Sequence, residues 1–347
     1  MEKSIIRYIS QNSGGGARVH CHQLNEILER EGYNTTTFIP KWNDCDELTC
    51  ASKTRFKYIN EFNDFFIFRF IFKSRNKILF LHSHLKRADI LFFLLSQIFR
   101  LKHVITVHYP YSKSDSKLWV YYIHKLALER ASKVIFISQF VKDHYLKEYG
   151  IENRHGRSVV YNASEVLSDK SKDFNNINVC LVGELSKRKG IENLPLLINK
   201  LISKDVLVNI NIYGDGPCRE VVTALKSSGG VNINYHGYVS DPRLIYLNNN
   251  ILLSLSVDEA FGRTVTEGLA NGLVPILNNS GAFPELITHG ENGYLFDDIN
   301  ELALLLSNVC KDKTELIKIA EFGQNSYKEK YSLEAFKKHY LTAMELK

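Results

Sequence analysis

The chain has 347 residues, of which 44% are hydrophobic and 24% are charged, and its formal net charge is +6. That length suggests two domains, each large enough to bury its own core. The composition is ordinary for a globular protein and argues against a disordered or fibrous chain.

The six cysteines include no Cys-x-x-Cys pair, which argues against a disulfide framework or a zinc cluster and favours a reducing compartment. No secretory signal is visible. The longest apolar stretch, from Ile90 to Phe99, is roughly ten residues long, or about half of a membrane span. We therefore expect a soluble or peripheral protein of the cytoplasm.

Charge is unevenly distributed along the chain. Residues 1–165 hold 25 basic and 16 acidic residues, whereas residues 166–347 hold 19 and 22. The basic excess is densest in residues 53–87, where basic side chains are interleaved with phenylalanines. Three interpretations stay open: a core helix with a solvated basic edge, contact with an anionic bilayer, or stacking on nucleobases, of which nucleic acid is the least favoured. The candidates for membrane contact are Arg69, Lys73, Arg75 and Lys77.

Strand and helix patterns alternate along the first half of the chain. Short runs rich in Val and Ile predict strands, and longer amphipathic stretches between them predict helices. The predicted strands are 4–10, 35–39, 78–81, 103–107, 133–137 and 158–161, and the predicted helices are 17–31, 87–99, 117–131 and 139–149. Irregular structure is expected from residue 40 to about 60. The alternation predicts a doubly wound, parallel α/β sheet.

A polar run at residues 168–176 interrupts this pattern and predicts an interdomain linker. The alternation then restarts. The predicted strands are 177–182, 208–213, 231–235, 251–256 and 273–277, and the predicted helices are 191–202, 219 onward, 242–248, 264–271, 300–311, 313–325 and 332–345. We therefore predict an N-terminal domain at residues 1–168 and a C-terminal domain at residues 169–331.

Several candidate site residues follow the carboxyl ends of predicted strands, where ligands bind in open α/β sheets. Gly14-Gly15-Gly16 would let the backbone and a helix N-terminus approach an anion, although a tight turn without a ligand is the alternative. Residue 19 is valine, so these glycines do not form a dinucleotide fingerprint. His108 follows strand 103–107, although a single histidine is more often structural. Asp44-Cys45-Asp46 is interpreted as a chance Asp-x-Asp match rather than a metal site.

A central block runs from Ile251 to Gly272. A buried strand leads into a short turn and then into a helix, so that Glu259 and Glu267 lie just beyond the strand's carboxyl end. On spacing alone, Thr264 and Glu267 form a capping box, in which the glutamate only satisfies a backbone amide. The other interpretation is a pair of carboxylates that bind a ligand.

The wider block reads Glu-Ala-Phe-Gly-Arg-Thr-Val-Thr-Glu-Gly-Leu-Ala-Asn-Gly from Glu259 to Gly272. It resembles the signature of the retaining glycosyltransferases of family four, in which seven residues separate two glutamates. The resemblance covers most of the chain and is best from about residue 177 to 296. It implies the GT-B fold, in which two Rossmann-like, doubly wound parallel-sheet domains face each other across a cleft. The first would bind the acceptor and the second the nucleotide-sugar donor, with a last helix at about 332–347 packed back on the first.

The resemblance also implies roles for individual residues. In the family, a glycine-rich loop and a basic residue contact the donor phosphates, and the second glutamate holds the ribose. A Phe-Gly turn offers backbone amides, and a Gly-Tyr-Val stretch contacts the base. The matching positions are Gly15, Gly16, Lys189, Glu267, Phe261, Gly262, Arg263 and Tyr238. The first glutamate and a histidine near the sugar are the catalytic candidates, and they match Glu259 and His108.

One position departs from the family pattern. The family usually carries an arginine after the glycine of the first turn of the second domain, and this chain has Glu184. A carboxylate cannot stabilise a diphosphate there, so either Lys187 and Arg188 take over or activity is weaker. Because no metal site is convincing, Arg188 and Lys189 are expected to offset the charge that builds on the leaving nucleoside diphosphate. No metal or other cofactor is expected.

These features predict a retaining, metal-independent hexosyl- or related transferase. It would move a sugar from a nucleoside-diphosphate sugar to a hydroxyl of a saccharide or lipid-linked saccharide. The expected setting is bacterial surface polysaccharide synthesis (O-antigen, capsule or lipopolysaccharide) at the inner face of the cytoplasmic membrane. Two alternatives stay open: a sugar-nucleotide epimerase of the same fold, and a degenerate glycosyltransferase that acts as a binding partner, which Glu184 favours.

Overall fold

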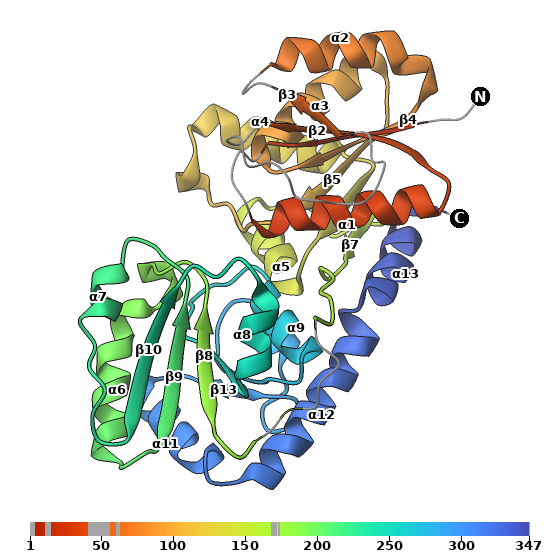
Figure 1. Cartoon of the computed structure of the whole chain (residues 1–347). Coiled ribbons are helices and arrows are strands. Elements are labelled where there is room, and N and C mark those ends of the chain that lie inside the picture. The colour runs from red at the N-terminus through yellow and green to blue at the C-terminus, as the bar shows by residue number, and fades with distance from the viewer. Residues whose placement is uncertain are drawn as a thin grey trace. The chain divides into compact units, whose positions relative to one another are not determined.

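A computed structural model of the chain describes residues 4–10, 15–40, 56–59, 63–167, 172 and 174–346 (Figure 1). The chain divides into two compact units. The first unit consists of Met1–Asn162 and Phe336–Lys347, and the second of Ala163–Ala335. The division therefore precedes the predicted boundary after residue 168. Residues 168–171 and 173 of the predicted linker lie outside the described residues.

The first unit is built on a seven-stranded parallel sheet in the order β3-β2-β1-β4-β5-β6-β7. Its strands are β1 (Ser4–Ile9), β2 (Asn34–Pro40), β3 (Phe56–Ile59), β4 (Ile78–His84), β5 (His103–Val107), β6 (Lys133–Phe136) and β7 (Arg157–Val159). Its helices are α1 (Gly16–Arg30), α2 (Asp64–Ser74), α3 (Lys86–Phe99), α4 (Leu118–Arg130), α5 (Gln139–Glu148) and most of α13 (Leu333–Met344). Strand β3 corrects the prediction of irregular structure up to residue 60, because four residues at a sheet edge are too few to show a period.

Helices cover both faces of this sheet, and α1 and α2 lie on opposite faces (Figure 1). On one face, Phe38 and Leu81 pack with Ile67 of α2 and Phe92 of α3. Burial on both faces explains why strands such as β5 and β6 read as nearly continuous apolar runs. The other face differs, because it carries a buried arginine, Arg7, among histidines.

The second unit is built on a six-stranded parallel sheet in the order β10-β9-β8-β11-β12-β13. Its strands are β8 (Asn178–Val182), β9 (Val208–Tyr213), β10 (Val231–Gly237), β11 (Ile251–Ser254), β12 (Val274–Asn278) and β13 (Tyr294–Phe296). Its helices are α6 (Leu194–Ser203), α7 (Arg219–Thr223), α8 (Pro242–Asn248), α9 (Arg263–Ala270), α10 (Phe283–Leu286), α11 (Ile299–Val309) and α12 (Lys313–Lys330). Aliphatic side chains of the strands, α6 and α11 form its core.

The last helix, α13, belongs to the first unit from Phe336 onward. Phe336 and Tyr340 are buried there. The ring of Phe336 lies 5.3 Å from that of His20, and the Tyr340 hydroxyl lies 3.2 Å from Nδ1 of His82. Among the described residues, no helix combines the length and the hydropathy that crossing a bilayer requires.

The chain order reverses beside the first strand of each sheet. Strand β1 lies between β2 and β4, and β8 lies between β9 and β11. Doubly wound sheets bind ligands at this switch point, just outside the carboxyl ends of the strands. The loops after β1, β4 and β5 in the first unit, and after β8 and β11 in the second, are therefore the places to look for a site.

Candidate active site

The turn after β8 carries the basic residues of the second unit. Lys187–Lys189 form a short 3-10 turn that ends at Gly190, whose φ is +70°. A Cβ atom on Gly190 would lie 2.3 Å from the carbonyl oxygen of Leu255, so only glycine lets this turn press against the end of β11. The close approach brings Lys189 next to the loop that carries Glu259.

Glu259 is held by two cations. Its Oε2 atom lies 2.6 Å from Nζ of Lys189 and 3.4 Å from Nη1 of Arg188, and it accepts a hydrogen bond of 3.1 Å from the hydroxyl of Ser256. Burial alone would raise the pKa of this carboxyl, but Lys189, Arg188 and Ser256 together hold it below its usual value. The loops therefore present an ionised carboxylate beside two positive charges.

Glu267 has partners that the sequence did not reveal. The hydroxyl of Tyr246 donates to Oε2 at 2.7 Å, and Nη2 of Arg263 lies 3.3 Å from Oε1. Tyr246 is buried, and burial followed by the charge of Glu267 raises its pKa well above the usual value, so the phenol remains a donor. No pattern in helix 242–248 signals this contact.

The capping-box interpretation is wrong. Helix α9 begins at Arg263 with Gly262 as its N-cap, and no side chain caps it. Thr264 is therefore inside the helix, and the Glu267 carboxylate points to Tyr246 and Arg263 instead of to a backbone amide. An uncapped helix N-terminus leaves amides that favour an anion.

The Phe-Gly turn before α9 is set by packing. The ring of Phe261 is buried and lies 6.2 Å from that of Tyr331. Gly262 has φ +95°, and a Cβ atom on it would lie 2.8 Å from the ring of Phe283. Any contact of Phe261 with a ligand would therefore use its main chain, because its side chain serves the core.

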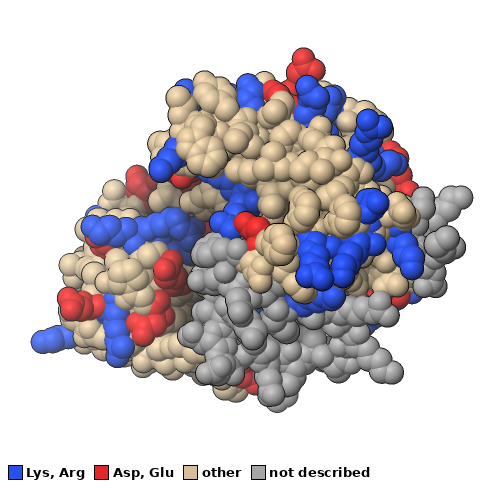
Figure 2. Space-filling model, turned by 90° about the horizontal axis from the view of Figure 1, so that it is seen from above, with Lys and Arg blue, Asp and Glu red and all other residues tan. Residues whose placement is uncertain are grey.

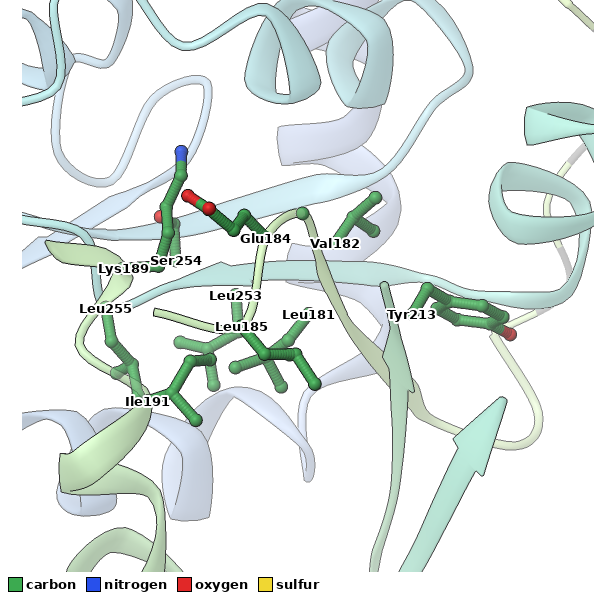
Figure 3. A pocket seen from close by; sticks show the side chains of 11 residues that line it. Leu181, Val182, Glu184, Leu185, Lys189, Ile191, Tyr213, Leu253, Ser254 and Leu255 are labelled. Atoms are coloured by element: carbon green, nitrogen blue, oxygen red, sulfur yellow. The ribbon is translucent and has the colours of Figure 1, made fainter. Parts of the chain in front are cut away.

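A small pocket lies at the ends of β8 and β11 (Figure 3). Aliphatic side chains, among them Leu181 and Leu253, line its base, and the side chains of Lys189 and Glu184 point to the same side (Figure 3). Glu184, the residue that departs from the family pattern, is exposed. Tyr238, the candidate for contact with the base, is 80% exposed on the loop after β10.

In the first unit, Gly15 is the N-cap of α1 and Gly16 is its first residue, and no side chain caps the helix. Gly14 lies outside the described residues, and so does the Asp44-Cys45-Asp46 pattern. The start of α1 thus has the form of an anion-binding helix N-terminus.

His108 lies directly after β5 in a cluster of histidines. Its Nε2 atom is 3.0 Å from Nδ1 of His84, and its ring packs edge-on against His20 at 4.8 Å. Burial, helped by the charge of Arg7, lowers the pKa of His108 to about 3, so the ring is neutral at physiological pH. His108 is therefore placed to act as a neutral hydrogen-bonding group.

The same cluster could be considered for a metal. Ring nitrogens of His20, His84 and His108 lie within 4.8 Å of one another, and three imidazoles are a familiar zinc set. However, a metal would have to replace the bond between His84 and His108. It would also lie beside the buried guanidinium of Arg7, which contacts His84 at 3.3 Å. The electrostatics of the cluster therefore disfavour a cation.

The predicted membrane-contact residues lie on and next to α2. Arg69, Lys73, Arg75 and Lys77 are all exposed. Of this helix, Ile67 and Ile71 reach the core, whereas Phe65, Phe66, Phe68 and Phe72 are 36–73% exposed. The view from above shows a tan surface without charged residues, and blue basic side chains lie along its border (Figure 2). Helix α2 therefore has a core face formed by Ile67 and Ile71 and an exposed surface that combines phenylalanines with basic side chains.

Comparisons with known proteins place the chain in a family. Residues 14–163 match the model described as glycosyltransferase family 4, and residues 165–329 match the model described as glycosyl transferases group 1. An uncharacterized 41.2 kDa protein of the cps region of Klebsiella pneumoniae is 26% identical over 94% of this chain and 96% of its own length.

Two further similar proteins have a named activity or a bound ligand. The O-antigen chain mannosyltransferase RfbU of Salmonella typhimurium is 26% identical over 54% of this chain and 54% of its own. The solved structure of Anabaena HepE in complex with UDP covers 99% of both chains with a TM-score of 0.83, at 18% identity. Because the two family models follow one another on two doubly wound units, this protein belongs to glycosyltransferase family four and has the GT-B fold.

Proposed function

We propose that the protein is a retaining glycosyltransferase that moves a sugar from a nucleoside-diphosphate sugar to a hydroxyl of a saccharide or lipid-linked saccharide. The observation that carries this proposal is the ionised Glu259 between Lys189 and Arg188 at the switch point of the second sheet. The likeness to HepE, which was solved with UDP, supports a nucleotide-sugar donor.

In this proposal the donor diphosphate contacts Lys189 and Arg188. Among the described residues, only the carboxylate of Glu259 pairs with Lys189 and Arg188, so these two cations carry one positive charge more than their partner and can attract phosphate. The side chain of Arg188 is 44% exposed and therefore accessible to a ligand. As the bond to the sugar breaks, charge grows on the leaving phosphate, and both cations then stabilise it more strongly than in the ground state.

The glutamates have different tasks. Glu267 accepts the ribose hydroxyls, while Tyr246 and Arg263 hold its carboxylate in place. Glu259 contacts the donor sugar near the reacting carbon, where a negative charge stabilises the positive charge that develops on the ring. Backbone amides of Phe261, Gly262 and Arg263 at the uncapped start of α9 face the sugar and phosphate.

The remaining donor contacts follow the same logic. Gly15 and Gly16 at the start of α1 approach the phosphates, and Tyr238 contacts the base. The anomeric configuration of the sugar is retained either by a front-face route, in which the leaving phosphate takes the acceptor proton, or through a covalent intermediate. The cations supply the charge stabilisation in both routes, and the reaction is proposed to need no metal ion.

The acceptor is proposed to be an intermediate of surface polysaccharide synthesis. The likeness to an O-antigen mannosyltransferase and to a cps-region protein supports this setting. A test uses the purified protein with a panel of UDP-, GDP- and dTDP-sugars. The donor that binds should raise the melting temperature, because a ligand bound to the native state stabilises it.

The same panel separates the rival activities. Incubation with the stabilising donor alone should give slow hydrolysis but no new sugar nucleotide, and an epimerised product would instead identify an epimerase. If no donor is bound or hydrolysed, the protein is the degenerate partner that Glu184 favours, and the proposal fails.

The surface of α2 and α3 is proposed to contact the inner face of the cytoplasmic membrane. Phe68, Phe72 and Phe99 form an aromatic cluster with ring centroids 5.6–6.4 Å apart, and Arg75 lies over Phe72 at 4.6 Å. Such a surface can insert phenyl rings at the headgroup level while cations meet anionic lipids, each worth about 1 kcal/mol.

The test is sedimentation with vesicles of phosphatidylglycerol and phosphatidylcholine. Changing Arg69, Lys73, Arg75 and Lys77 to glutamine should release the protein from the anionic vesicles. The matched control changes four exposed lysines elsewhere, Lys204, Lys226, Lys311 and Lys318, and should bind as the parent does. Equal binding of both variants would reject the membrane surface.

A further inference from the structure

Arg7 is a buried cation without an acidic partner. It lies on β1, is 0% exposed, and donates from Nη1 to the carbonyl oxygen of Cys21 at 2.9 Å and to Oδ1 of Asn25 at 3.3 Å. In the described part of the chain, no carboxylate pairs with it. A buried, unpaired charge is costly, and natural proteins keep such groups where they have a task.

The second guanidinium nitrogen of Arg7 contacts a histidine. Its Nη2 atom lies 3.3 Å from Nε2 of His84, whose Nδ1 atom lies 3.0 Å from Nε2 of His108. A guanidinium has donors and no acceptor, and it stays protonated in proteins. Nε2 of His84 must therefore accept, which fixes the direction of the whole chain of hydrogen bonds.

The direction decides which nitrogen of His108 carries the proton. A neutral imidazole has one donor and one acceptor, so His84 carries its proton on Nδ1 and donates it to Nε2 of His108. The remaining proton of His108 must then be on Nδ1. We propose that Arg7 and His84 are positioning residues that hold His108 in the Nδ1–H form, so that His108 acts as a hydrogen-bond donor.

The surroundings favour neutral rings. Burial, then the charges of neighbouring histidines and Arg7, lower the pKa of His84 well below its usual value, and burial does the same for His108. The groups that face the pair are the rings of His20 and His82 and the guanidinium of Arg7. With both rings neutral, the opposite direction would set an N–H of His84 against the N–H of Arg7.

The inference rests on the proposed function for its chemical meaning. Among the described residues, Nδ1 of His108 has no hydrogen-bond partner. A donor there suits a hydroxyl or phosphate oxygen of the sugar nucleotide, which are acceptors. It does not suit proton abstraction, because Nε2 is already occupied by His84. His108 therefore orients or polarises the donor and is not a general base.

The test reads the tautomer directly in the protein without substrate. Histidines are labelled with 15N, and two-bond proton–nitrogen spectra at neutral pH distinguish Nδ1–H from Nε2–H rings; the His108 signals are those lost in His108→Gln. We expect His108 in the Nδ1–H form with an excess of roughly tenfold, the value of one hydrogen bond. An Nε2–H ring in the parent protein would overturn the proposal.

Three variants test whether Arg7 and His84 set this tautomer. Arg7→Met removes the donor that sets the direction and should leave His108 in a mixture of tautomers, whereas Arg7→Lys keeps a donor without an acceptor and should preserve the Nδ1–H form. His84→Phe keeps the ring volume, removes both nitrogens and should also give a mixture, which provides a second route if Arg7→Met does not fold. Unchanged tautomers in a folded Arg7→Met or His84→Phe variant would refute the role of the changed residue.

Activity gives a separate reading. Arg7→Met and His84→Phe should lower kcat/KM for the donor by roughly tenfold, with Arg7→Lys close to the parent. A parent protein with the expected tautomer but no transfer would reject the proposed function and keep the inference. Sugar transfer by a parent protein whose His108 carries its proton on Nε2 would keep the proposed function and reject the inference.

Discussion

In the second unit, the loops after β8 and β11 gather an ionised carboxylate and two cations close to solvent. In the first unit, strands β1 and β4 and the loop after β5 instead gather buried, neutral imidazoles around the guanidinium of Arg7. Both places lie at the switch point of a doubly wound sheet. The topology therefore fixes where a site forms, while burial decides whether its groups are charged. The solvent-facing edge suits phosphate binding, and the buried edge suits fixed hydrogen-bond directions.

The largest expected difference between the two edges is their response to acid. Burial lowers the pKa values of His103 and His108 to about 3, and it lowers those of His82 and His84 well below the usual 6.5. Below pH 6.5 these histidines therefore bind protons in the unfolded chain but not in the folded one. The free energy of unfolding then falls with pH, by about 1.4 kcal/mol per pH unit for each such histidine.

Denaturant unfolding at pH 7.5, 6.5 and 5.5 measures this slope. Replacing His103 with asparagine should reduce this slope by the contribution of about one proton. Replacing His155, which is 90% exposed, should leave the slope unchanged. Glu259 behaves in the opposite way. Its lowered pKa means that its ion pair contributes fully above the usual carboxyl pKa and is lost only as the pH falls through the lower, folded value. Constant stability from pH 7.5 to 5.5 would show that the imidazoles are not held neutral.

The next effect concerns a buried histidine–aspartate contact of the first unit. Nε2 of His124 lies 3.1 Å from Asp89, whose carboxylate also accepts from Ser83, and both side chains are almost fully buried. His124→Ala removes a hydrogen-bond partner from this buried carboxyl, and we expect a loss of about 1–3 kcal/mol in the free energy of unfolding. His155→Ala is the matched control. Similar melting of both variants would mean that the pair is dispensable.

In the second unit the corresponding change should affect turnover and leave the fold intact. Glu259→Gln removes the negative charge beside the reacting carbon, and we expect kcat to fall by about 10²–10³, or about 2.7–4 kcal/mol. Lys189 and Arg188 lose a competitor for phosphate, so donor binding should be kept or improved. The exposed Glu192→Gln variant is the control. Near-normal turnover of Glu259→Gln would remove Glu259 from the catalytic residues.

The sequence predicted the fold through its strands. Buried parallel strands such as 103–107 and 133–136 are mostly apolar runs between helical patterns, and that signal is local. The short edge strand β3 lacks it, and it was missed. The start of α9 was also misplaced, because the backbone of Gly262 and its packing on Phe283 set it, and neither shows in the Thr-x-x-Glu spacing.

The candidate site was predictable where residues cluster along the chain and not where they meet across it. Glu259 and Glu267 share one block, and Lys189 follows a strand end, so their positions could be read from the sequence. Tyr246 and Arg7 have no such signal. Arg7 meets His84 across 77 positions, and only the pairing of β1 with β4 brings the two together.

The smallest predicted effect separates two neighbouring lysines of one turn. Lys187 is 80% exposed and pairs with Glu192 at 3.1 Å, whereas Lys189 is 21% exposed and contacts Glu259 at 2.6 Å. If the diphosphate lies against Lys189, Lys189→Ala loses one charged hydrogen bond, and donor binding and transfer should each weaken by about 1.5–3 kcal/mol. Lys187→Ala removes an equal charge from the same turn and should change both much less than Lys189→Ala does, because a solvent-exposed pair contributes little. Calorimetric titration of both variants with the donor decides the point: equal losses would mean that the turn acts through its total charge, and unchanged affinity of Lys189→Ala would place the phosphates elsewhere.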